Sequence, residues 1–88
     1  MSRHEIFARD HNHRVIVGWD PPLQSYFGQV IDRRKEASDP DNKIILWVGG
    51  EPGRFIDEIE PLARKIAPFA ELGENVRREL YTDKETDR

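Results

Sequence analysis

The sequence predicts an α+β domain: a small antiparallel sheet with a C-terminal amphipathic helix and a short second helix packed on one face. Three observations support this class. Two apolar runs between residues 14 and 31 are hinged at an Asp-Pro-Pro corner, and a β-branched and aromatic run covers residues 43–48. After residue 55 the apolar residues change to a helical period. These runs give three strands, and an N-terminal strand would make a fourth.

The first two predicted strands flank the proline corner. Residues 15–17, Val-Ile-Val, are β-branched without polar alternation, which is typical of a strand covered on both faces. Asp20 precedes two prolines that remove ladder donors, so the strand ends there. Residues 25–31 alternate between two faces of a second strand. One face carries Phe27 and Ile31, and the other carries Tyr26, Gly28 and Val30. Because Gly28 has no side chain, we expect either a β-bulge there or the close approach of a neighbouring aromatic.

Two further segments complete the predicted sheet. Residues 5–9 either form an extra strand that turns at residues 10–13, or are frayed. Residues 32–43 contain Ser-Asp-Pro-Asp-Asn and are predicted to be an exposed polar loop. Residues 43–48, Lys-Ile-Ile-Leu-Trp-Val, are the strongest strand signal in the chain. The loop offers no helix for a parallel crossover, so we predict that the strands it joins are antiparallel.

A helical stripe follows the sheet. Its members recur with a helical period at Phe55, Ile59, Leu62, Ile66 and Phe69. Asp57 and Glu60 resemble a capping box, which would place Pro61 in the first turn, where proline is tolerated. Pro68 is expected to kink or end the helix, and Gly73 to cap it if it continues.

The C-terminal segment divides into two parts. Residues 74–81 can form a second short helix with an apolar side. Residues 82–88 are all polar or charged, so we predict a disordered tail. The predicted organisation is one domain over residues 1–81, with residues 1–13 as its least certain part, followed by this tail.

Composition limits the kinds of function. The chain of 88 residues has no cysteine, which excludes disulfides, thiol chemistry and thiolate zinc sites. Its first residues lack a signal-peptide core and no apolar run is long enough to span a membrane, so we expect a soluble, cytoplasmic protein. The net charge of −3 disfavours a general nucleic-acid binder. The charges are uneven, since residues 1–35 hold six basic and four acidic residues and the remainder hold eight and 13.

The predicted partner-binding site is the proline corner. Aromatic and proline residues gather there around a leucine, and rigid apolar side chains lose little entropy on binding. The predicted site consists of Trp19, Pro21, Pro22, Leu23 and Tyr26. Trp47 is assigned to the core instead, and Trp19 could equally belong to the core. An exposed strand edge offers a second contact mode, by self-pairing into a homodimer or by strand addition from a partner.

Two basic features suggest contact with anions. Arg33, Arg34 and Lys35 form the one dense basic cluster, which could contact single-stranded nucleic acid beside Tyr26 or Trp19. Acidic residues follow the cluster immediately, so a solvated hairpin end is the favoured interpretation. Residues 49–54, Gly-Gly-Glu-Pro-Gly-Arg, could bind an anion through backbone amides and Arg54, but they match no phosphate-loop fingerprint.

Catalytic and metal chemistry are the weaker hypotheses. Asp20 and Glu51 both follow strand ends and could act as an acid and base pair with Arg54, but only if their strands are parallel to each other. His4, His11 and His13, with Asp10, have a spacing that a mobile turn explains equally well, so we predict no metal and no cofactor. The sequence therefore favours a non-enzymatic protein-interaction module with an unidentified protein partner.

Overall fold

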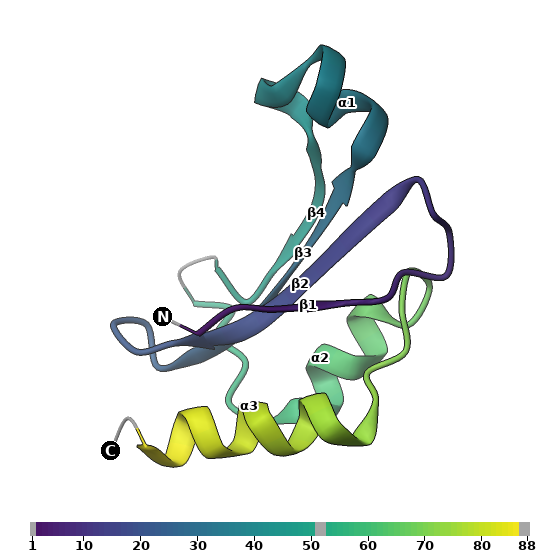
Figure 1. The fold of residues 1–88 in the computed structure, drawn as a ribbon. Helices are drawn as coiled ribbons and strands as arrows, with labels where there is room; N and C mark the ends of the chain where they lie inside the picture. Colours follow the sequence, from purple (N-terminus) through teal and green to yellow (C-terminus); the bar gives the residue numbers. More distant parts are fainter. Residues whose placement is uncertain (1, 51–52, 87–88) are drawn as a thin grey trace.

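The computed structural model describes residues 2–50 and 53–86, and it confirms the α+β class (Figure 1). A four-stranded antiparallel sheet in the order β1-β2-β3-β4 packs against α2 and α3. The strands are β1 (His4–Ile6), β2 (His13–Asp20), β3 (Ser25–Asp32) and β4 (Ile44–Val48). The helical segments are α1 (Arg33–Ser38), the 3₁₀ turn η1 (Pro40–Asn42), α2 (Ile59–Ile66) and α3 (Glu74–Thr86).

The long hairpin of β2 and β3 forms the centre of the sheet. Its register pairs Val15 with Val30 and Val17 with Gly28, so the predicted division of β3 into two faces is confirmed. Gly28 lies under α2, where an added Cβ would be 3.1 Å from methyl groups of Leu62 and Ile66. Neither predicted explanation is correct, because the close neighbours are aliphatic and the bulge in β3 and β4 lies between the Val30 and Ile31 pairs. Glycine is needed here because it lets the helix approach the sheet closely.

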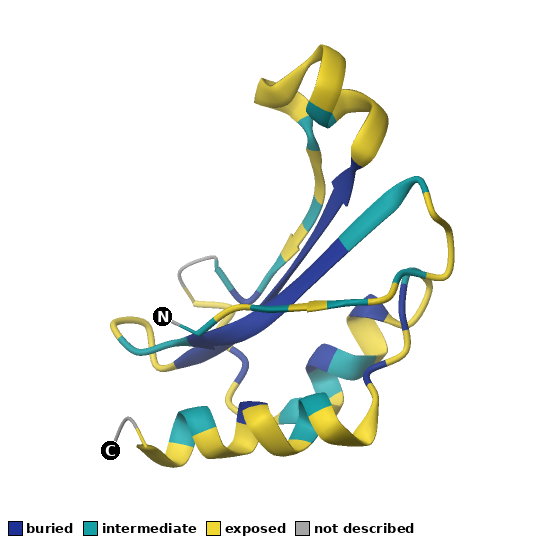
Figure 2. Ribbon diagram, viewed as in Figure 1, coloured by how far each residue is buried: buried dark blue, intermediate teal, exposed yellow. Residues whose placement is uncertain are grey.

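The core lies between one face of the sheet and the two long helices (Figure 2). Its buried members are Val15, Val17, Trp19, Tyr26, Val30, Ile56, Leu62, Ile66, Ala70, Leu72 and Leu80. A smaller buried cluster of Ile16, Phe27 and Ile31 lies on the other face. Strand β4 is exposed or intermediate in Figure 2, because within the described part of the chain it is an edge strand with β3 as its one neighbour.

Helix α2 is shorter than the predicted apolar stripe, which ran from Phe55 to Phe69. It spans Ile59–Ile66, so Phe55 precedes it and is half exposed. Its N-cap is Glu58, whose side chain makes no capping bond, and the predicted capping box is therefore wrong. Pro61 does lie in the first turn, and the helix ends two residues before Pro68, as the missing amide donor requires.

Helix α3 is longer than predicted. It continues to Thr86 through most of the segment that we expected to be disordered, and residues 87–88 lie outside the described part. Contacts with distant elements account for this extension. Asp83 lies 2.7 Å from His4 Nε2, and the Lys84 ammonium donates to the Asp57 carbonyl. A charged sequence is therefore helical here because tertiary contacts hold it.

The segment predicted to be a polar loop is largely helical. Asp32 is the N-cap of α1, and its carboxylate accepts hydrogen bonds from the backbone of Arg34 at 2.9 Å and of Lys35 at 3.4 Å. The Pro40 turn η1 then returns the chain to β4. Figure 1 shows that this tip projects from the sheet away from α2 and α3.

None of the helices in the described ranges is both long enough and apolar enough to cross a bilayer.

Candidate functional site

The proline corner is a tight turn between β2 and β3. Asp20 pairs with Ser25 across the hairpin, and the amide of Gln24 donates to the Pro21 carbonyl at 3.1 Å. Gln24 has a positive φ of 51°, which closes the turn. The chain therefore turns between β2 and β3 at the Asp-Pro-Pro corner, as predicted.

The aromatic residues of the predicted binding site belong to the core. Trp19 and Tyr26 are 2% and 1% exposed and form an edge-to-face pair with ring centroids 5.0 Å apart. The ammonium of Lys84 lies 5.6 Å from the Trp19 ring, and the Tyr26 hydroxyl donates to the Leu80 carbonyl. Helix α3 thus covers both rings, and they offer no surface to a partner.

What is exposed at the corner is small. Leu23 is 36% exposed and Pro22 is also exposed, whereas Pro21 is half-buried. Binding by these three residues stays a prediction. Without the two aromatic rings, the corner presents little rigid apolar area.

The larger apolar surface lies along β4. Trp47 is 53% exposed, so its assignment to the core is wrong. It pairs with Gln29 on the face of the sheet opposite α2 and α3, where no described helix packs. Ile44 and Ile45 on the same strand are each more than one-third exposed. We call Ile44, Ile45 and Trp47 the β4 edge.

The β4 edge combines exposed side chains with an unpaired backbone. Among the strands of the described residues β3 alone pairs with β4, so alternate amides and carbonyls of β4 face away from the sheet. A bulge at Ile45 interrupts the register between the Val30 and Ile31 pairs. A bulge is a common protection of edge strands, yet the side chains here are apolar and uncharged. Such an edge can pair with another strand.

A hollow of about 270 Å³ adjoins the C-terminal end of β4. Its described lining includes Leu46, Trp47 and Val48 from the strand and two charged side chains, Arg54 and Lys65. Both charges are positive. Lys65 is exposed, so this end of the edge can meet an acidic neighbour.

The loop after β4 is tied to β3 by a buried hydroxyl. Ser25 accepts a hydrogen bond from the Ile56 amide at 2.8 Å and lies 3.1 Å from the Gly49 carbonyl. Gly49 has a φ of 79°, and an added Cβ would lie 2.0 Å from the Tyr26 carbonyl oxygen. Anion binding by residues 49–54 stays a prediction, because Glu51 and Pro52 lie outside the described residues.

The condition for the catalytic pair is met by the topology. Strands β2 and β4 both run antiparallel to β3, so their C-terminal ends lie at the same end of the sheet. Asp20 is half-buried there, but Glu51 is outside the described residues and its distance from Asp20 is undefined. Catalysis by this pair stays a prediction.

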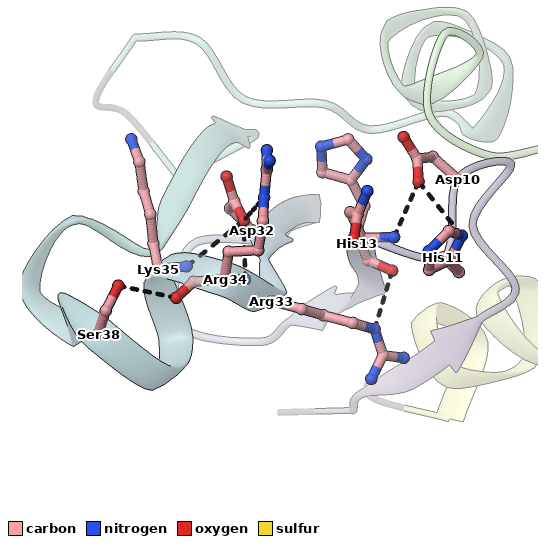
Figure 3. Close-up of polar contacts among 9 residues, drawn as sticks. Asp10, His11, His13, Asp32, Arg33, Arg34, Lys35 and Ser38 are labelled. Carbon is pink, nitrogen blue, oxygen red and sulfur yellow. Dashed lines mark hydrogen bonds and ion pairs between the residues drawn. The ribbon is translucent and has the colours of Figure 1, made fainter.

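The basic cluster lies at the start of α1, on the other side of the molecule from Trp19 and Tyr26. Figure 3 shows Arg33 reaching toward β2, where its Nε donates to the His13 carbonyl at 3.4 Å. Arg34 lies 3.6 Å from the Asp32 carboxylate. Burial alone would raise the pKa of Asp32, but the backbone hydrogen bonds from α1 lower it overall. Arg33, Arg34 and Lys35 are all exposed.

The three histidines do not gather at one point. His4 lies between Asp83 and Glu79 of α3, His13 packs edge-on against Phe69, and His11 is exposed. Over the described ranges, no three potential ligands are close enough to hold a metal ion.

Three features escaped the sequence analysis. Phe7 is 99% exposed, β4 is an open edge with Trp47 outward, and Ser25 anchors the loop after β4. No sequence pattern signals the first or the last. The second follows from strand order, which an apolar run without alternation does not reveal.

Comparison with protein-family models, curated proteins and solved structures gave no match.

Proposed function

We propose that this protein is a non-enzymatic interaction module that pairs with a second copy of itself through the β4 edge. The exposure of Trp47 on an uncharged edge strand is the observation that supports this most strongly. Pairing would satisfy the outward amides and carbonyls of β4 and partly cover its large apolar side chains with those of the second strand. A cytoplasmic location stays a prediction.

Charge complementarity favours a second copy as the partner. In a two-fold antiparallel pair, the start of one β4 lies beside the end of the other. Two exposed carboxylates, Asp39 and Asp41, precede the start of β4. Lys43 lies between them and the strand and is half-buried. The end of β4 adjoins Arg54 and Lys65. Carboxylates of one copy would therefore approach cations of its partner at both ends of the pair.

The test is sedimentation velocity over a hundredfold range of protein concentration. We expect a shift from monomer to dimer that Ile45→Lys abolishes, because a charge on an edge strand opposes pairing. Leu23→Ser and Tyr81→Ser change exposed residues elsewhere and should leave the dimer intact. Circular dichroism melts of each variant report whether the fold is kept. A wild-type chain that stays monomeric, or a dimer that Ile45→Lys leaves unchanged, contradicts the proposal.

A charge swap tests the orientation of the pair. Asp41→Lys and Lys65→Glu should each weaken the dimer, since each places like charges opposite one another. The double variant restores opposite charges and should recover the wild-type dissociation constant at low salt. Loss of dimer in the double variant would show that the two strands are not antiparallel about a two-fold axis.

A further inference from the structure

A second surface, independent of the β4 edge, surrounds the start of β2. It is a hollow of about 760 Å³ lined by residues 5–11 together with His13 and Arg33. It brings the segment between β1 and β2 against the first residue of α1. Basic and aromatic side chains from two distant parts of the sequence therefore face the same space.

Two arginines in this hollow are positioned by backbone carbonyls. Arg9 donates its Nε to the Ala67 carbonyl at 2.8 Å, and Arg33 donates its Nε to the His13 carbonyl at 3.4 Å. Neither guanidinium forms an ion pair with a residue in the described ranges, and both are exposed. Their terminal nitrogens can therefore bind the oxygens of one ligand in a bidentate manner.

The two carboxylates of the hollow are already engaged. Glu5 accepts from Arg14 at 2.7 and 3.2 Å, and this hydrogen bonding lowers the pKa of Glu5. Asp10 accepts from the Asn12 amide at 2.9 Å and lies 3.8 Å from His11. Figure 3 shows the Asp10 carboxylate pointing toward the turn that contains His11. Asp10 keeps its negative charge, because a backbone amide is neutral, and the cations of the hollow that form no ion pair within the described ranges are Arg9 and Arg33.

Phe7 distinguishes this hollow from a simple anion site. Its ring is 99% exposed, so it contributes almost nothing to the core. An aromatic ring beside arginines is the arrangement that proteins use to bind single-stranded nucleic acid, with a base stacked on the ring and phosphates on the cations. His11 and His13 add two further groups that can contact phosphate.

We infer that this hollow binds a nucleotide unit, with the base on Phe7 and the phosphate between Arg9 and Arg33. The ligand is either a free nucleotide or one unit of a single-stranded nucleic acid. Arg33 of the basic cluster would thus act with Phe7, and not with the buried Trp19 or Tyr26.

Fluorescence anisotropy with a labelled mixed-sequence single-stranded DNA tests this inference. We expect binding at low salt that Phe7→Ala weakens about tenfold, as loss of one stacked base does, while Tyr81→Ala has no effect. Unlabelled AMP should compete much better than inorganic phosphate. Tighter binding of AMP or of DNA identifies the source of the nucleotide, and either order supports the site.

The arginines are tested through the salt dependence. In a double variant, Arg9→Gln with Arg33→Gln, the slope of log affinity against log salt should fall by about 0.7, which corresponds to one neutralised phosphate of a single strand. Arg64→Gln with Arg78→Gln removes two exposed arginines elsewhere and should leave the slope unchanged. No binding at low salt, equal competition by phosphate and AMP, or indifference to Phe7→Ala overturns the inference. So does a poly-glutamate peptide that binds equally well.

Discussion

Ser25→Ala tests how the loop after β4 is held. The side chain is completely buried, and its oxygen accepts from the Ile56 amide at 2.8 Å while its hydroxyl donates to a neighbouring carbonyl, the closest being Tyr26 at 2.8 Å. Alanine fits the same space but leaves the Ile56 amide without this acceptor. A buried unpaired amide costs about 1–3 kcal/mol of unfolding free energy.

The expected loss is large enough to measure by thermal unfolding. For a domain of this size each kcal/mol lowers the melting temperature by about 4–8 °C, so the decrease should be about 4–24 °C. Ser38→Ala is the matched control, because that hydroxyl also donates to a backbone carbonyl, of Arg34 at 2.9 Å, but lies exposed on α1. Its melting temperature should stay close to that of the wild type. Equal melting temperatures for the two variants would refute the argument that Ser25 anchors the loop.

Two further predictions concern the sheet and the cap of α1. Gly28→Val should destabilise the domain by about 1–3 kcal/mol, because its side chain would collide with Leu62 and Ile66, and urea unfolding measures the loss. The lowered pKa of Asp32 means that its carboxylate stabilises the fold above the ordinary value of 3.8, and that this contribution is lost as the pH falls through the lower folded-state pKa. Asp32→Asn should therefore flatten the stability profile below about pH 4; an unchanged profile would contradict this assignment.

The sequence was sufficient for the elements whose pattern is local. The β-branched run in β2 and the alternation in β3 specified two adjacent strands, and the period from Ile59 to Ile66 specified a helix against them. The missing amide of Pro68 gave the end of that helix. These features depend on neighbours in sequence, so a pattern can reveal them.

The remainder depends on contacts between distant residues. Asp32 caps a helix in a segment rich in turn residues. Contacts with His4 and with the Asp57 carbonyl hold the end of α3 in a helix that its own sequence does not favour. The exposed fractions of Trp19 and Trp47 were predicted less well. Each tryptophan comes after a run of apolar residues, and such a run does not show which face of a strand is covered. Only the strand order and the position of α3 show that the first is enclosed and the second lies on an edge.

Acrylamide quenching of the two tryptophans tests the central claim most directly, that the helices enclose one face of the sheet and leave the β4 edge open. In Trp19→Phe the remaining Trp47, which is 53% exposed, should be quenched readily in dilute protein and become shielded as the concentration rises and β4 pairs. In Trp47→Phe the remaining Trp19 should be protected at every concentration. Equal quenching of the two indoles, or a protected Trp47 in dilute protein, would contradict the account.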